Sequence, residues 1–211
     1  AFWRAVAKTC AESPAIFCYD LMNEPVVPGG KRKEKDWLGP PFAGKHFVQV
    51  ITLDQSGRPR PEIARAWTKQ LVAAIREVDE KHLITIGLVD WSLDRPGLTS
   101  GFVPEKIAPE LDFLCIHLYP QKGKFDEDLE TLKGFSKVGK PVVIEETFPL
   151  KAPLEEFEKF LFASREHAHG WVGFYWGKTP AELRQGKTIN DAIVLSWLDW
   201  FVKNGQKIQE K

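Results

Sequence analysis

The stretch AIFCYDLMNEP at residues 15–25 joins a short apolar segment directly to a polar tripeptide. Its first part, Ala15-Ile-Phe-Cys-Tyr-Asp-Leu21, has the length and composition of a buried β-strand bounded by turn signals. The residues before it, Phe2 to Glu12, have the pattern of a helix that Ser13-Pro14 ends. Helix followed by buried strand is the repeating unit of α/β proteins.

The same alternation recurs along the rest of the chain. Near-continuous apolar runs predict further strands at Leu83–Leu88, Phe113–His117, Val142–Glu146 and Trp171–Trp176. Helical spacing of apolar residues predicts helices at Pro61–Glu80, Glu127–Val138, Leu154–His167 and Ile189–Val202. Apolar strands between amphipathic helices indicate a parallel sheet that helices cover.

The missing phosphate-binding motifs narrow the fold class further. No predicted strand is accompanied by a Gly-x-Gly-x-x-Gly or P-loop sequence, which weakens the case for a nucleotide-binding doubly wound sheet. We therefore expect a (β/α)8 barrel of the TIM type, with residues 1–211 forming one partial barrel domain. A complete barrel takes about 250 residues and eight strands. Five strands would leave two open edges, which favour self-association.

A long segment separates the first strand from the second. Residues 25–60 are rich in Gly, Pro and charge, and we expect them to form a long loop or excursion after the strand. Within it, Phe47–Leu53 alternates enough to suggest a local strand. Trp37, Phe42 and Phe47 would form either the wall of a substrate subsite or a small core of the loop itself.

Composition limits the classes of partner. The chain has 29 Lys and Arg against 29 Asp and Glu, so a neutral substrate fits better than nucleic acid. No stretch approaches the roughly 20 apolar residues of a membrane span. The three Cys have no spacing typical of disulfide frameworks or zinc sites. The chain begins without Met, so an export signal could lie upstream. The compartment stays open, and a secreted or periplasmic full-length protein is compatible with the sequence.

Polar and aromatic residues gather where the predicted strands end. In a parallel barrel these ends meet on one rim, where active sites are built. Two carboxylates that face one another across an aromatic-lined cleft are what cleavage of a glycosidic bond requires. The candidates, in chain order, are Asn23 and Glu24, Trp91, His117 and Tyr119, Glu145 and Glu146, and Trp176.

The motifs resemble those of the cellulase-like glycoside hydrolase family 5, in clan A, over nearly the whole chain. Asn23-Glu24-Pro25 is similar to the motif that ends the family's fourth barrel strand, so only strands four to eight are recognisable. The resemblance implies that Glu24 is the acid/base and that Asn23 hydrogen-bonds the sugar hydroxyl next to the scissile carbon. Pro141-Val-Val-Ile-Glu-Glu-Thr147 is similar to the seventh strand and places Glu146 at the nucleophile position.

Three further residues are assigned by the same resemblance. His117-x-Tyr119 looks like the family's sixth-strand pair, with Tyr119 oriented toward the nucleophile, and Trp176 looks like the platform under the sugar. Two positions depart from the family, since Glu145 and Phe148 stand where Gly is usual or frequent. Alternation along a strand sends only one of Glu145 and Glu146 inward, so the choice of Glu146 depends on the resemblance.

The implied function is a retaining endo-β-glycosidase that hydrolyses a neutral polysaccharide, of the β-glucan, cellulose or mannan type, by double displacement on two glutamates. The alternatives are a noncatalytic carbohydrate-binding barrel relative, an incomplete inactive fragment, or another clan A glycosidase. The expected partner is an oligo- or polysaccharide, with no membrane, metal or organic cofactor. We expect little activity from the 211-residue chain alone, because the first three strands of the family are not recognisable in it.

Overall fold

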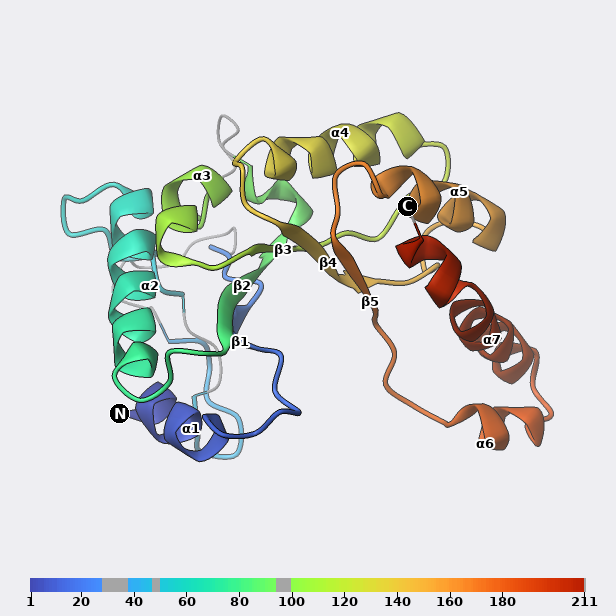
Figure 1. Ribbon diagram of the computed structural model, residues 1–211, viewed down its shortest axis with the longest axis horizontal. Coiled ribbons are helices and arrows are strands. Elements are labelled where there is room, and N and C mark those ends of the chain that lie inside the picture. Colours follow the sequence, from blue (N-terminus) through green and yellow to red (C-terminus); the bar gives the residue numbers. More distant parts are fainter. Residues whose placement is uncertain (28–37, 47–49, 94–99, 211) are drawn as a thin grey trace.

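The computed structural model describes residues 1–27, 38–46, 50–93 and 100–210. Its centre is a sheet of five parallel strands, which lie side by side in chain order (Figure 1). A doubly wound sheet would reverse its strand order at one point, so the consecutive order fits a segment of a barrel. The strands are β1 (Cys18–Asn23), β2 (Leu83–Val89), β3 (Leu114–His117), β4 (Val142–Thr147) and β5 (Gly170–Gly173).

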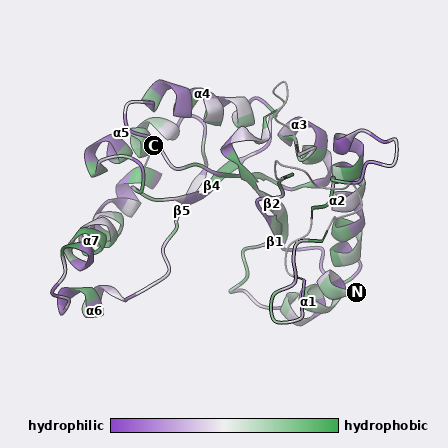
Figure 2. Ribbon diagram, turned by 180° about the vertical axis from the view of Figure 1, so that it is seen from behind, coloured by the Kyte–Doolittle hydropathy of each residue, from purple (hydrophilic) through white to green (hydrophobic). Residues whose placement is uncertain are grey.

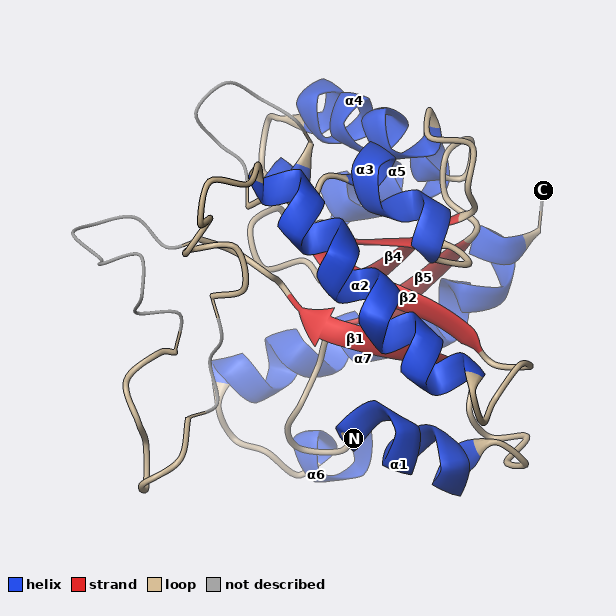
Figure 3. Ribbon diagram, turned by 90° about the vertical axis from the view of Figure 1, so that its left-hand side faces the viewer, coloured by secondary structure: helices blue, strands red, loops and turns tan. Residues whose placement is uncertain are grey.

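Helices cover the outer side of the sheet. Those that follow a strand along its outer side are α2 (Arg60–Arg76), α3 (Pro104–Ile107), α4 (Phe125–Ser136) and α5 (Leu154–Ser164) (Figure 3). Around them lie α1 (Phe2–Cys10), α6 (Pro180–Arg184), α7 (Ile189–Gln209) and the 3-10 turns η1 (Asp90–Ser92) and η2 (Ala108–Glu110). Figure 2 shows the helices in both purple and green, because each combines polar and apolar residues.

The core lies between the strands and these helices. The sheet contributes apolar residues of β2, β3 and β4, and α4 and α5 contribute three large aromatic rings. Trp200 of α7 packs edge-on against Phe157. The largest fully buried side chains include Ile84, Ile86, Leu88, Leu114, Ile116, Phe135, Phe157 and Phe160.

The strands and main helices confirm the expected alternation, although several elements begin or end at other residues. The fifth strand ends at Gly173 rather than Trp176, because its last pairing is with Thr147 and the chain then leaves the sheet toward α6 (Figure 1). The predicted local strand at 47–53 is wrong for residues 50–53, because the backbone N–H of Leu53 donates to the Val50 carbonyl in a turn. Residues 47–49 lie outside the described ranges.

The expected aromatic cluster in the 25–60 segment is only partly visible. Trp37 and Phe47 lie outside the described residues, and Phe42 is exposed. Phe42 therefore does not pack into a loop core in the described part of the chain. In that same part, no helix combines the length and the apolar character needed to cross a membrane.

Candidate active site

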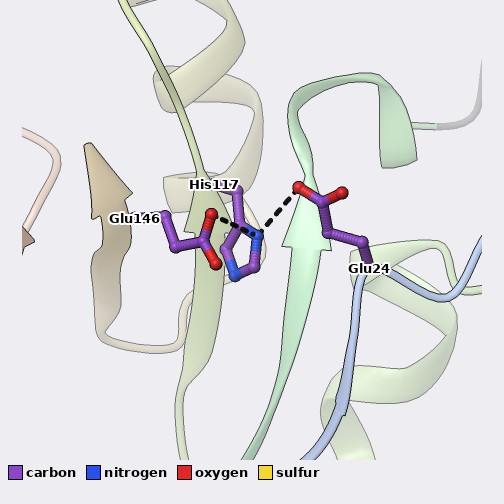
Figure 4. A group of neighbouring side chains, drawn as sticks. All are labelled: Glu24, His117 and Glu146. Carbon is purple, nitrogen blue, oxygen red and sulfur yellow. Dashed lines mark hydrogen bonds and ion pairs between the residues drawn. The ribbon is translucent and has the colours of Figure 1, made fainter. Parts of the chain in front are cut away.

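Glu24 follows β1 directly in an unusual backbone conformation. Its φ is 46°, in the left-handed region that costs a non-glycine residue roughly 1 kcal/mol or more. The backbone N–H of Glu24 donates to the Gly87 carbonyl of β2 at 2.8 Å, which holds this turn against the neighbouring strand. Figure 4 shows the result: the Glu24 carboxylate reaches toward His117 at the end of β3.

His117 lies between two glutamates. Its side chain is almost fully buried, and Nδ1 is 3.0 Å from Oε1 of Glu24 and 3.4 Å from Oε2 of Glu146 (Figure 4). The two glutamates come from β1 and β4, which are not neighbours in the sheet. Because the carboxyl ends of parallel strands meet on one edge, the sheet brings these distant positions of the sequence onto one ring.

Tyr119 fixes the second glutamate. Its hydroxyl donates to Oε2 of Glu146 at 2.8 Å. Burial, and then the Glu146 carboxylate, raise the pKa of Tyr119, so the phenol stays protonated and remains a donor. One oxygen of Glu24, one of Glu146 and one nitrogen of His117 all lie within 4.8 Å of one another. A cation could contact all three, but the contacts of His117 with both glutamates already account for their closeness.

The neighbouring Glu145 also reaches His117, from the other side of the ring. Its Oε2 is 3.8 Å from Nε2, although consecutive residues of a regular strand face opposite ways. The register of β3 and β4 shifts between Ile116 and His117. Such an irregularity inserts an extra residue on one strand and re-aims side chains, so both glutamates of β4 can contact one imidazole.

A further carboxylate, that of Asp20, lies near His117 and Glu145 and was not predicted from the sequence. Asp20 on β1 accepts hydrogen bonds from the backbone N–H of Gly87 at 2.8 Å and of Met22 at 3.2 Å. Burial, followed by the charge of Glu145, raises the pKa of Asp20 to about 6. The sequence does contain a signal for it, because a charged residue inside a buried apolar strand is rare unless it has a function or a partner.

The remaining candidates do not join this cluster. Asn23 is exposed at the end of β1, next to Glu24. Trp176 lies three residues beyond β5 and is 97% exposed, so among the described residues no neighbouring side chain holds its ring. Phe148, which could have crowded the nucleophile, is instead buried against Tyr175 and Phe201.

Trp91 lies beside a separate cavity on the same rim. The cavity, of about 550 Å³, opens between η1 and the first turns of α4. Its lining is polar apart from the indole, and one of its carboxylates, Asp128, is buried and accepts from the Gln121 backbone N–H at 2.9 Å. The lining includes Asp90, Trp91, Gln121, Lys124, Glu127 and Asp128.

Comparison with known proteins gives the same fold. The chain superimposes on the endo-β-1,4-mannanase of Thermotoga petrophila with a TM-score of 0.53 at 18% identity, over 83% of this chain and 42% of that one. The β-mannanase of the blue mussel Mytilus edulis superimposes with a TM-score of 0.51 at 18% identity, over 92% of this chain and 55% of that one. Both likenesses support a partial (β/α)8 barrel.

Similarity in sequence agrees. Mannan endo-1,4-beta-mannosidase A of Podospora anserina is 26% identical over 210 residues, which are 91% of this chain and 48% of that protein. Mannan endo-1,4-beta-mannosidase 2 of Oryza sativa is 23% identical over 175 residues, which are 70% of this chain and 33% of that protein. The chain thus spans less than half of either relative. The family model for Cellulase (glycosyl hydrolase family 5) matches residues 1–179. Because that match covers most of its length, the chain belongs to glycosyl hydrolase family 5.

Proposed function

We propose that this chain provides the catalytic glutamates of a retaining endo-β-mannanase, with Glu24 as acid/base and Glu146 as nucleophile. The observation that supports it most is the closeness of the two carboxylates, whose nearest ligand atoms lie within 4.8 Å. Retaining glycosidases hold their two carboxyl groups about 5 to 5.5 Å apart, whereas inverting enzymes leave about 6.5 to 9.5 Å for a water. The spacing favours retention.

In this mechanism Glu146 attacks the anomeric carbon while Glu24 gives its proton to the departing glycosidic oxygen. The bond to the leaving sugar breaks as the bond to Glu146 forms, which produces a glycosyl-enzyme ester. Glu24, now ionised, removes a proton from water, and the hydroxide equivalent displaces Glu146. The Tyr119 hydroxyl, at 2.8 Å from Glu146, orients the nucleophile for the first step.

Mannan is the proposed substrate because the similar proteins of Podospora anserina and Oryza sativa are mannan endo-1,4-beta-mannosidases by name. The equal numbers of acidic and basic residues suit such a neutral polymer. We assign the sugar contacts to Asn23, His117 and Tyr119 near the two glutamates. Trp176 would be the platform at the cleavage point and Trp91 the wall of a more distant subsite, since indole faces suit the apolar faces of sugar rings.

The decisive experiment is to trap the ester. A 2-deoxy-2-fluoro-β-mannosyl fluoride slows both steps but keeps a good leaving group, so the labelled enzyme accumulates and peptide mass spectrometry locates the sugar. We expect the label on Glu146. A label on Glu145 would reassign the nucleophile. Hydrolysis of mannan with inversion at the anomeric carbon would contradict the mechanism. The absence of both labelling and hydrolysis in protein that still binds mannan would favour the noncatalytic carbohydrate-binding alternative.

A further inference from the structure

The second nitrogen of His117, Nε2, lies near two further carboxylates, those of Glu145 and Asp20, which the proposed reaction does not use. Its Nε2 is 3.8 Å from Oε2 of Glu145, and this oxygen is buried without a hydrogen-bond partner among the described residues. Asp20 lies beside the same atoms. A Cβ placed on Gly87 would lie 2.6 Å from Nε2 of His117 and 3.1 Å from Oδ2 of Asp20. The His117 ring and the Asp20 carboxylate therefore converge where Gly87 lacks a side chain.

The neighbours of the His117 ring determine which of its two nitrogens carries a proton. When Glu24 and Glu146 are both ionised, Nδ1 faces two acceptor carboxylates and is therefore an N–H donor. A neutral imidazole has only one N–H. Nε2 would then present a bare lone pair to the buried Glu145 oxygen, and two acceptors would face one another with no proton between them. A second N–H, at Nε2, removes this conflict.

We propose that Asp20 and Glu145 are positioning residues that hold a second proton on His117, at Nε2, so that the ring lies as an imidazolium between Glu24 and Glu146. Among the described residues around the ring, no other group can carry the positive charge. The charged side chains near it are the carboxylates of β1, of Glu24 and of β4, and the nearby residue of β2 is Gly87. The phenol of Tyr119 is neutral, and so is the thiol of Cys115, because burial raises its pKa.

The charge balance around His117 agrees with the geometry. Burial alone would lower the pKa of His117, but the Glu145 and Glu24 side chains outweigh it and the net shift is upward. Asp20 is held in place by two backbone N–H groups through Oδ1, which leaves Oδ2 on the side of the ring. The imidazolium in turn offsets the repulsion between two catalytic carboxylates that lie within 4.8 Å.

The proton itself is tested by nuclear magnetic resonance on the 211-residue chain, with no need for hydrolysis. The ¹⁵N shifts of both ring nitrogens distinguish an imidazolium from either neutral tautomer, and a His117→Asn variant identifies the signal. In the unmodified chain at pH 6 we expect both nitrogens to be protonated. In Glu145→Gln the midpoint of the titration should fall by about one pH unit, the effect of removing one nearby opposite charge. Asp20→Asn should lower it less.

Two comparisons make the result specific. Glu155→Gln removes an exposed glutamate of α5 that pairs with Lys159, and it should leave His117 unchanged. His82, at the other end of the sheet, should titrate as before in every variant. A bare Nε2 in the unmodified chain at pH 6 would overturn the proposal, even if the variants failed to fold. So would an unchanged His117 midpoint in folded Glu145→Gln.

Discussion

The two ends of the sheet use the same residue types in opposite proportions. At the amino ends of the strands, Asp79 is a single carboxylate surrounded by donors. At the carboxyl ends, His117 is a single ring surrounded by carboxylates. Each end also has one tyrosine hydroxyl that donates to an acid, Tyr19 to Asp79 and Tyr119 to Glu146. The difference lies in whether donors or acceptors are in excess.

The amino end is a saturated network. Asp79 accepts from the Tyr19 hydroxyl and the His82 ring, each at 2.6 Å, and from the backbone N–H groups of Lys81 and His82. Its side chain has no exposed surface. Nε2 of His82 lies 3.1 Å from the Ser13 carbonyl. Each polar side-chain atom of Asp79 and His82 has a partner, so these two residues tie the loops between helices and strands together.

The carboxyl end is unsaturated. More acids meet there than there are protons or donors to satisfy them, and Glu145 keeps a buried oxygen without a hydrogen bond in the described residues. An arrangement of this kind is costly for folding and useful for chemistry, because the surplus charge is available to a substrate. In barrel enzymes the carboxyl face is catalytic and the amino face contributes stability. Substitutions at the carboxyl end should therefore affect activity most, and substitutions at the amino end should affect stability most.

The largest effect is expected at Glu24. In a longer protein that contains this chain and hydrolyses mannan, Glu24→Gln should slow that hydrolysis by about 10² to 10⁴, the usual contribution of a general acid. Aryl mannosides with good leaving groups need little protonation and should lose far less. Initial rates on both substrates measure the contrast. Equal losses would argue against an acid role for Glu24.

Substitution of Asp79 should lower the stability of the protein more than substitution of a glutamate at the carboxyl end does. Asp79→Ala leaves several buried donors without an acceptor and should lower the free energy of unfolding by about 3 kcal/mol. Glu146→Gln, which removes one charge from a crowd of acids, should leave stability nearly unchanged. Urea unfolding of both variants gives the comparison. A stability loss at Glu146 as large as that at Asp79 would mean that the two ends do not differ in the proposed way.

A smaller effect is expected at Gly87. The Cβ of Gly87→Ala would meet Nε2 of His117 at 2.6 Å, and displacing the buried ring should cost about 1 to 3 kcal/mol. Gly205→Ala in α7, where a Cβ meets nothing within 4 Å, is the matched control and should be neutral or stabilising. Both are measured by thermal unfolding. If Gly87→Ala is as harmless as the control, the ring is not held where we place it.

The smallest effect is in the pH dependence of stability. Hydrogen bonds from Tyr19 and His82 outweigh burial and hold the pKa of Asp79 below its usual range, so the contribution of Asp79 is lost as pH falls. The Asp79 hydrogen bond raises the pKa of His82, so its contribution is complete below the ordinary pKa of histidine and is lost as pH rises through the raised value. Tm should therefore decline both as pH falls and as pH rises, and Asp79→Ala should make Tm less dependent on pH.

The sequence predicted the strands and helices well, because each depends on the pattern of apolar residues within a short segment. The alternation of strands and helices, and the meeting of Glu24, His117, Tyr119 and Glu146 on one rim, follow from parallel strands in chain order. The position of Glu145 could not be predicted. Its contact with His117 depends on a register shift between β3 and β4 that only the pairing of the two strands creates.

Other differences have equally physical causes. Trp176 was placed at the end of a strand by its apolar neighbours, but a strand ends where its partner stops pairing, here after Thr147. Asp20 was read as part of an apolar run, because a sequence pattern does not show which buried residue will meet Gly87 across the sheet.

The left-handed backbone of Glu24 has a consequence for the history of the family. At a φ of 46° a glycine would be relaxed where a glutamate is strained. Selection for stability alone would thus favour the replacement of Glu24, and its proposed role as acid/base would oppose the change. A lineage that came to bind sugar without cutting it should drift to Gly or Asn at this position early, before its core diverges. The residue at position 24 would then date the loss of activity.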